Sequence, residues 1–147
     1  MRIQLGPYLF FDGNCEAALR FYANCLGGKI TAMQTNEDAP NAAAMTPEWR
    51  AKIRHASMVV GTREFMGADR RPEVYEAPKG FSVLLGFVNP AEAERVFRAL
   101  AVGGTVTAPF GETFWARRFG MLTDQFGVPW MINCYPLPTV NRAMSTT

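Results

Sequence analysis

Several features that often reveal a protein's function are scarce in this sequence. It has one histidine and three cysteines, and Cys15, Cys25 and Cys134 lack Cys-x-x-Cys spacing. That number and spacing argue against a disulfide framework or a zinc site. No apolar run approaches the ~18 residues of a membrane-spanning helix. No block of like charge offers the electrostatic footprint of a nucleic-acid-binding protein.

The charge is nearly balanced. The formal net charge is +2, with acidic and basic residues interspersed. Such a surface does not attract nucleic acid or an anionic membrane, so we expect a small neutral or weakly charged molecule as partner. The first seven residues lack the apolar segment and small-residue cleavage site of a secretory signal. We therefore expect a cytoplasmic protein with no nucleic-acid or membrane partner.

The most informative feature that is present is an internal duplication. Residues 16–30 align without a gap with residues 92–106, at a constant offset of 76 (16 to 92). The identities include a Glu-Ala pair, a phenylalanine and two consecutive glycines. One half alone would be too small to bury its apolar face, whereas two copies can share a core.

The same order of elements is predicted in each half. A short apolar strand, at residues 8–11 and again at 81–87, precedes a helix that Asn14 or Asn89 would cap and that paired glycines would end. A second strand and two glycine-linked strands follow. Each half therefore has the order β-α-β-β-β, which predicts an α+β fold.

The duplication also predicts the domain boundaries. We expect a single domain over residues 1–136, in which the first module covers residues 7–67 and the second covers 81–134. Residues 137–147 carry no apolar pattern and are expected to form a flexible tail. The first module also contains an insertion beyond the repeat, with a short helix predicted at residues 47–50. Insertions of this kind often form lids or partner contacts.

Three segments carry a family resemblance: YLFFDGNCEAA at residues 8–18, His55-Ala56 before a strand, and ETFWARRFGMLTDQFGVPWM at residues 112–131. They resemble the PhnB-like branch of the vicinal-oxygen-chelate superfamily, which includes glyoxalase I, extradiol dioxygenases and bleomycin-resistance proteins. Members of this branch are often labelled 3-demethylubiquinone-9 3-methyltransferase-like. The resemblance covers about residues 7–134 and implies that the two modules form a cupped mixed sheet with the helices outside.

The same resemblance argues against metal chemistry. In metal-using members of the superfamily, each module supplies one ligand from its first strand and one from its last. The matching positions here are Pro7 or Tyr8, Met66, Ser82 or Val83, and Met131. None is a plausible ligand for a hard metal ion. The paired glycines follow helices, whereas a methyl-donor site uses a glycine-rich turn between strand and helix. We therefore expect no metal and no cofactor.

His55 and Glu112 are the candidate acid and base. The ordinary pKa of histidine lies near neutrality, which suits proton transfer or hydrogen bonding to a ligand, and His55 begins a strand expected to line the cup. Its alternative role is to cap the preceding segment. Glu112 and Arg117 would clamp a polar ligand head. The alternative is that Glu112 pairs with Arg117 or Arg118 and fixes the loop.

Other candidates would contact the ligand through rings, a thioether or a guanidinium. Aromatic and methionine side chains inside a cup suit a flat or irregular apolar ligand. The alternative is that many of them simply pack in the core. The predicted ligand-binding residues are Tyr8, Phe10, Met66, Trp115, Arg117 and Trp130.

Two functions remain open. One is a small-molecule-binding protein that lacks the usual metal ligands. The alternative is a metal-independent lyase, isomerase or transferase that uses His55 and Glu112 as acid and base. We also expect a homodimer, because the apolar insertion at residues 42–45, Trp49 and the aromatic pair at residues 114–115 suit an isologous contact.

Overall fold

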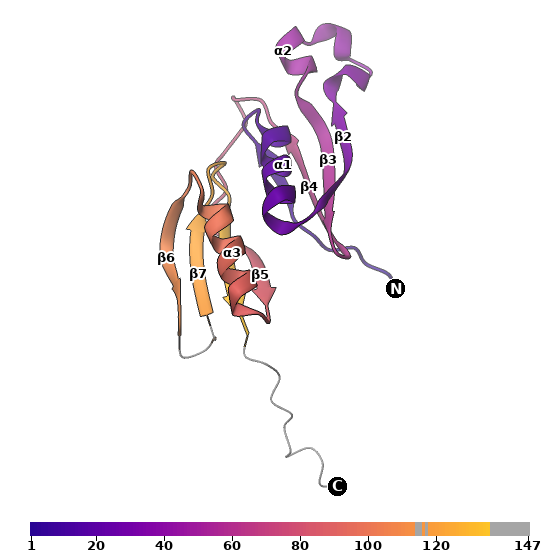
Figure 1. Ribbon diagram of the computed structural model, residues 1–147. Coiled ribbons are helices and arrows are strands. Elements are labelled where there is room, and N and C mark those ends of the chain that lie inside the picture. The colour runs from indigo at the N-terminus through magenta and orange to yellow at the C-terminus, as the bar shows by residue number, and fades with distance from the viewer. Residues whose placement is uncertain (114–115, 117, 136–147) are drawn as a thin grey trace. The chain divides into compact units, whose positions relative to one another are not determined.

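The computed structural model describes residues 1–113, 116 and 118–135 (Figure 1). The chain divides into two compact units, Met1–Pro78 and Lys79–Thr147, which we call the first and second unit. The first predicted module lies within the first unit and the second module within the second. No helix within the described residues has the length and apolarity needed to cross a membrane.

The first unit contains a four-stranded mixed sheet and one long helix. Its strands lie in the order β1-β4-β3-β2, with β1 parallel to β4 and the other neighbours antiparallel. The helix α1 packs against one face of this sheet (Figure 1). The elements are β1 (Tyr8–Phe11), α1 (Cys15–Leu26), β2 (Lys29–Thr35), η1 (Asn36–Asp38), η2 (Ala42–Ala44), α2 (Pro47–Arg50), β3 (Ile53–Val60) and β4 (Arg63–Asp69). The predicted order and the predicted short helix are confirmed.

The second unit repeats this topology. Its strands lie in the order β5-β8-β7-β6, and β5 is parallel to β8. The elements are β5 (Val83–Phe87), α3 (Pro90–Ala101), β6 (Thr105–Gly111), β7 (Arg118–Thr123) and β8 (Pro129–Cys134). Two four-stranded mixed sheets, each with one long helix, confirm the predicted α+β fold.

Strand register extends the sequence repeat into the sheets. Tyr8 pairs with Met66 across β1 and β4, and Leu84 pairs with Met131 across β5 and β8. Tyr8 and Leu84 are separated by the same offset of 76 that relates the helices (8 to 84). Each parallel strand pair therefore has an equivalent in the other unit.

The core of the first unit lies between α1 and one face of its sheet. Leu9 and Phe11 are buried beneath the helix, and the ring of Tyr22 lies 6.4 Å from that of Phe11 and 5.4 Å from that of Phe65. Fully burying a large apolar side chain of this kind contributes roughly 1.5–3 kcal/mol to the stability of the fold. Gly67 permits this packing, because a Cβ there would lie 2.9 Å from the Phe11 ring.

The two long helices begin differently. The Asn89 side chain accepts hydrogen bonds from Ala91 N at 2.9 Å and Glu92 N at 3.3 Å, as predicted for a cap. Asn14 makes no such bond. Instead, the buried carboxylate of Asp69 accepts from Cys15 N at 2.9 Å and from Ile53 N at 2.8 Å. Asn14 is therefore the N-cap residue of α1, as predicted, but the Asp69 carboxylate and not the Asn14 side chain accepts the hydrogen bond from the start of the helix.

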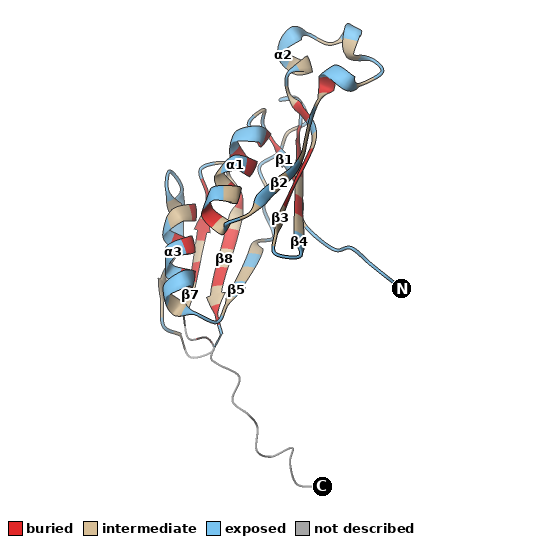
Figure 2. Cartoon of the chain, turned by 45° about the vertical axis from the view of Figure 1, so that its right-hand side comes forward, coloured by how far each residue is buried: buried red, intermediate tan, exposed pale blue. Residues whose placement is uncertain are grey.

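The second unit buries α3 against its own sheet. The helix contributes Ala93, Val96, Phe97 and Leu100 to the core. Buried and less buried residues alternate along β8, as expected for a strand with one covered face (Figure 2). Gly120 of β7 allows Phe97 to approach, since a Cβ there would lie 2.7 Å from its ring.

Candidate functional site

The face of the first sheet opposite α1 carries exposed aromatic side chains. Leu9 and Phe11 point toward the helix, so Tyr8 and Phe10 point to the opposite face, where they remain 39% and 37% exposed. Their ring centres lie 5.3 Å apart. Met66 is the register partner of Tyr8 on β4 and is partly exposed. We call the surface made by Tyr8, Phe10, Met66 and His55 the open face.

His55 joins this face through Tyr8. The Tyr8 hydroxyl lies 3.0 Å from His55 Nδ1, and the two ring centres are 5.7 Å apart. Because β4 lies between β1 and β3, the Tyr8 side chain reaches across one strand. Desolvation, with a smaller effect from Cys15, raises the pKa of Tyr8, so its hydroxyl stays protonated at neutral pH. The His55 ring is therefore held by Tyr8, and it does not cap the preceding segment.

An arginine borders the open face. The guanidinium carbon of Arg70 lies 3.6 Å from the centre of the Phe10 ring. The backbone N–H of Arg70 donates to the Phe11 carbonyl at 2.8 Å, which fixes the start of its side chain. Arg70 also lines a pocket of about 380 Å³ between α2 and the segment that follows β4. A cation and an aromatic surface therefore meet at this end of the sheet.

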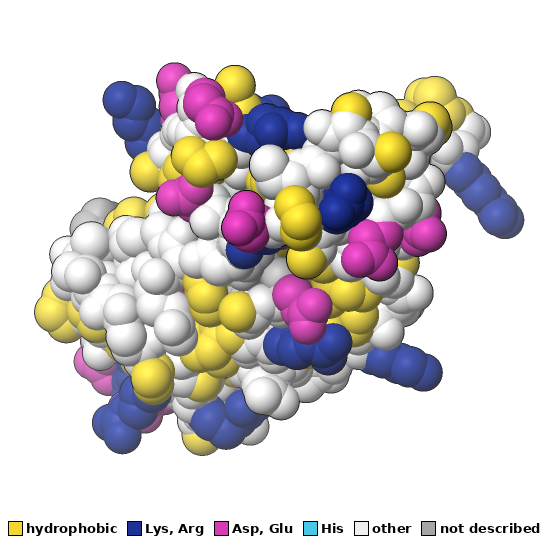
Figure 3. Space-filling model, turned by 90° about the horizontal axis from the view of Figure 1, so that it is seen from above, with side chains coloured by type: hydrophobic (Ala, Val, Ile, Leu, Met, Phe, Trp, Pro, Cys, Tyr) yellow, Lys and Arg dark blue, Asp and Glu magenta, His cyan; other side chains and the backbone are white. Residues whose placement is uncertain are grey.

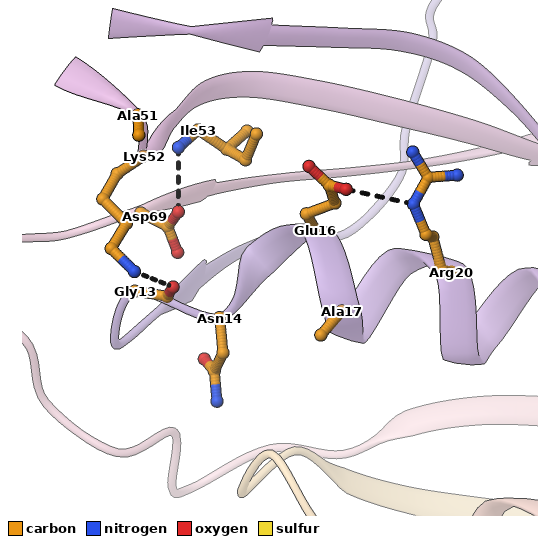
Figure 4. A pocket seen from close by; sticks show the side chains of 9 residues that line it. All are labelled: Gly13, Asn14, Glu16, Ala17, Arg20, Ala51, Lys52, Ile53 and Asp69. Atoms are coloured by element: carbon orange, nitrogen blue, oxygen red, sulfur yellow. Dashed lines mark hydrogen bonds and ion pairs between the residues drawn. The ribbon is translucent and has the colours of Figure 1, made fainter. Parts of the chain in front are cut away.

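A second pocket, of about 510 Å³, lies at the start of α1 (Figure 4). Its polar groups mainly bind one another. Lys52 Nζ donates to the Gly13 carbonyl at 2.8 Å, and Arg20 pairs with Glu16 at 3.2 Å. Each carboxylate oxygen of Asp69 accepts a hydrogen bond from a backbone N–H group, that of Cys15 or that of Ile53. The contacts of Lys52 and Asp69 join the start of α1 to the start of β3, so they stabilise the first unit.

Glu112 lies in the second unit, after β6. Its carboxylate pairs with Arg118 at 2.8 Å, and its side chain is 78% exposed. The structure therefore favours the alternative in which Glu112 fixes its own loop through Arg118. Arg117 and Trp115, predicted to bind ligand, and Phe114 lie outside the described residues. His55, the other candidate acid or base, belongs to the first unit.

Trp130 occupies a different position from the one predicted. It is fully buried on the α3 side of its sheet, and its indole N–H donates to Asp124 Oδ2 at 2.8 Å. Asp124 also accepts from the N–H groups of Phe126 and Val128. Side chains alternate along a strand, so Met131, not Trp130, faces the other side. Trp130 therefore stabilises the second unit.

The resemblance places the superfamily's ligand positions at Pro7 or Tyr8, Met66, Ser82 or Val83, and Met131. In the structure Tyr8 pairs with Met66, and Leu84 pairs with Met131. A phenol, an alkyl group and two thioethers do not fit a hard metal ion. Nor does any group of three or more His, Cys, Asp or Glu within the described residues have a geometry that could hold a metal.

Sequence reasoning missed two arginines and two acids. Asp69 and Asp124 are both buried. Asp69 accepts hydrogen bonds from backbone groups distant in the sequence, and Asp124 accepts them from the turn that follows it. Arg70 and Arg71 form an adjacent pair after β4, and that pair was the only available signal. Their aromatic contacts arise from residues elsewhere in the chain, which a linear pattern does not reveal.

Comparison with known proteins gives a consistent assignment. Residues 4–132 match the family described as the Glyoxalase/Bleomycin resistance protein/Dioxygenase superfamily. Protein YjdN from Escherichia coli (strain K12) is 36% identical over 137 residues, which cover 88% of this chain and 93% of YjdN.

Solved structures extend this likeness to the fold. Protein PA1353 from Pseudomonas aeruginosa is 47% identical, with a TM-score of 0.83, and the match covers 92% of this chain and 100% of that one. The PhnB protein from Bacillus cereus, named provisionally as a 3-demethylubiquinone-9 3-methyltransferase, is 24% identical with a TM-score of 0.73; the match covers 90% of this chain and 99% of that one. The latter likeness shows the fold alone.

Proposed function

This chain belongs to the Glyoxalase/Bleomycin resistance protein/Dioxygenase superfamily, and on that premise we propose that it is a small-molecule-binding protein whose ligand lies on the open face of the first unit. The resemblance predicted from the sequence is confirmed at the level of the superfamily, with a PhnB protein among its structural neighbours. The open face contains Tyr8 and Met66, which pair across β1 and β4 and which the resemblance marks as candidate ligand positions of this unit. Binding there would use rings and a hydrogen-bonding pair in place of a metal.

The observation that carries this proposal is the exposed Tyr8–Phe10 pair beside Met66 and His55. Contiguous exposed apolar surface is unfavourable in water and usually marks a binding region. Two rings with centres 5.3 Å apart suit the flat surface of an aromatic ligand. The Tyr8–His55 pair, 3.0 Å between hydroxyl and Nδ1, offers a donor and an acceptor at one side of that surface. These features together favour a flat, mainly apolar molecule with a polar group.

Calorimetric titration with a panel of flat aromatic compounds tests the proposal. Phe10→Ala should weaken binding roughly ten-fold, because an aromatic pair contributes about 0.5–1.5 kcal/mol beyond its buried area. Tyr8→Phe should weaken compounds with a polar group more than those without one. Val102→Ala is the control, since Val102 is an exposed apolar residue that follows α3. Equal effects of Phe10→Ala and Val102→Ala would place the ligand elsewhere.

A second candidate is the metal-independent lyase, isomerase or transferase expected from the sequence, with His55 of the first unit as its acid or base. The observation that favours it is the Tyr8–His55 hydrogen bond, which orients an imidazole on an exposed face. An enzyme should lose turnover in His55→Gln while retaining most of its affinity. A binding protein should show no turnover in the wild type. The two results separate the candidates.

We also propose a homodimer that uses the insertion around α2. Trp49 of α2 is partly exposed, and the neighbouring Arg50 donates to the Ala42 carbonyl of η2 at 3.5 Å. An aromatic side chain in such a surface suits an isologous contact. Light scattering should report a dimer for the wild type and a shift toward monomer for Trp49→Asp. A monomeric wild type at micromolar concentration would remove this proposal. The cytoplasmic location stays a prediction.

A further inference from the structure

Two consecutive arginines after β4 lie on aromatic rings at one end of the open face. The guanidinium carbon of Arg70 is 3.6 Å from the centre of Phe10, and that of Arg71 is 4.9 Å from the ring of Trp49 in α2. Both arginines line the pocket of about 380 Å³ between α2 and the segment after β4. Two guanidinium groups thus line one cavity next to the Phe10 ring, and the third cation of the cavity, Lys52, donates to the Gly13 carbonyl.

Neither guanidinium is neutralised by a neighbouring acid. Asp12, Glu48 and Glu73 line the same pocket, yet within the described part of the chain no carboxylate lies within ion-pair distance of Arg70 or Arg71. Other arginines, such as Arg20 and Arg98, do pair with a glutamate one helical turn away. Arg70 and Arg71 instead each lie against an aromatic ring, at 3.6 Å and 4.9 Å from its centre.

Stacking prepares these arginines to bind an anion. A guanidinium held over a ring face by a cation–π contact still has N–H donors to offer, and its planar fork matches the two oxygens of a carboxylate or phosphate group. The ring also limits the rotamers of the long side chain, so less conformational entropy is lost when an anion binds. On the face drawn in Figure 3, acidic and basic side chains are interspersed, and the formal net charge is only +2, so the net charge alone favours an anionic ligand little.

We propose that the ligand is an organic anion, in which a carboxylate or related oxyanion binds Arg70 and Arg71 while the flat apolar body covers Phe10 and Tyr8. This inference rests on the proposed function and names the ligand class of the same site. The four side chains form a continuous row. His55 is hydrogen-bonded to Tyr8, the Tyr8 ring lies beside the Phe10 ring, and the Arg70 guanidinium lies over the Phe10 ring. An elongated molecule with a negative group at one end and a polar group at the other fits that row.

Titration with a matched pair of probes tests the inference. 2-Naphthoate carries a carboxylate at neutral pH, and 2-naphthamide has the same ring system without the charge. In the wild type, naphthoate should bind at least about ten-fold more tightly, as expected for one or two charge-assisted hydrogen bonds. Arg70→Gln and Arg71→Gln should each reduce that preference several-fold and leave naphthamide nearly unchanged.

Two further variants make the result specific. Arg70→Lys keeps the charge but loses the planar fork, so it should recover only part of the preference. Arg63→Gln removes an exposed arginine at the start of β4, the strand that Arg70 and Arg71 follow. It should leave the preference for naphthoate intact. Thermal melting of each variant checks that the fold is retained.

The outcomes separate this inference from the proposed function. If naphthamide binds and Phe10→Ala weakens it, but naphthoate has no advantage, the anion inference is wrong and the binding function stands. A naphthoate preference that survives both glutamine substitutions also overturns the inference. If neither probe binds, or if both bind independently of Phe10, the proposed function itself fails.

Discussion

Replacing Asp69 should destabilise the protein far more than replacing Asn14, although the sequence marks Asn14 as the helix cap. Asp69 Oδ1 accepts from Cys15 N at 2.9 Å and Oδ2 accepts from Ile53 N at 2.8 Å, so one carboxylate joins the start of α1 to the start of β3. Asn14 makes no side-chain cap bond. The two substitutions therefore distinguish the structure from the local sequence pattern.

The magnitude follows from the bonds that are lost. Hydrogen bonds to a charged group contribute roughly 1.5–3 kcal/mol each, and removing the acceptor leaves two backbone N–H groups without a partner. Allowing for partial rescue by water, Asp69→Ala should lower the free energy of unfolding by about 3 kcal/mol. Asn14→Ala should change it by less than about 0.5 kcal/mol, in the range of an uninvolved surface residue. Asp69→Asn retains one acceptor and should fall between them.

Urea unfolding followed by circular dichroism measures these differences, with the slope of the transition checked for constancy between variants. For a chain of this size, about 3 kcal/mol corresponds to a decrease in melting temperature of roughly 6–12 °C. The reasoning would be refuted by an Asp69→Ala variant that loses less than about 1 kcal/mol. An Asn14→Ala variant that loses more than Asp69→Ala would refute it equally.

Three further predictions concern other parts of the chain. Trp130→Phe keeps the buried ring but removes the N–H that Asp124 accepts, so urea unfolding should show a loss of about 1–3 kcal/mol. Desolvation, with smaller effects from Asp69 and Glu16, raises the pKa of Cys15 to about 12, and all three cysteines are buried. A thiol reagent at pH 8 should therefore label the folded protein slowly. Rapid stoichiometric labelling would contradict this prediction. Glu112→Gln removes an exposed ion pair with Arg118 and should change the free energy of unfolding by less than about 0.5 kcal/mol in the same urea assay; a larger loss would show a structural role for the loop.

The fold could be predicted because its main signals are local and repeated. The strand and helix patterns around residues 8–30 recur at residues 84–106, and each pattern depends on neighbouring residues in the sequence. The hydrogen-bond acceptor at the start of α1 could not be predicted in this way. Asp69 lies 54 residues from Cys15, and it takes the place of the nearby Asn14 side chain only once β4 has paired with β1. Long-range pairing decided this detail over local propensity.

The candidate site was predictable only in part. Tyr8, Phe10 and Met66 were identified as ligand-binding residues, and strand register places all three on one face, although binding there remains a proposal. Trp130 was misplaced because a shift of one residue along a strand moves a side chain to the opposite face. Arg70 and Arg71 were missed because their significance depends on the rings beneath them, which come from β1 and α2.

Methionine-methyl NMR tests the central claim most directly. The protein is labelled at its methionine methyl groups and titrated with 2-naphthoate and 2-naphthamide in the presence of a metal chelator. The signal of Met66, assigned with Met66→Leu, should shift and saturate, because its side chain lies on the open face beside Tyr8. The signal of Met58, fully buried in the core, is the internal control and should change little. A Met66 signal that does not move, or that moves only when a metal ion is supplied, would contradict metal-independent binding on this face.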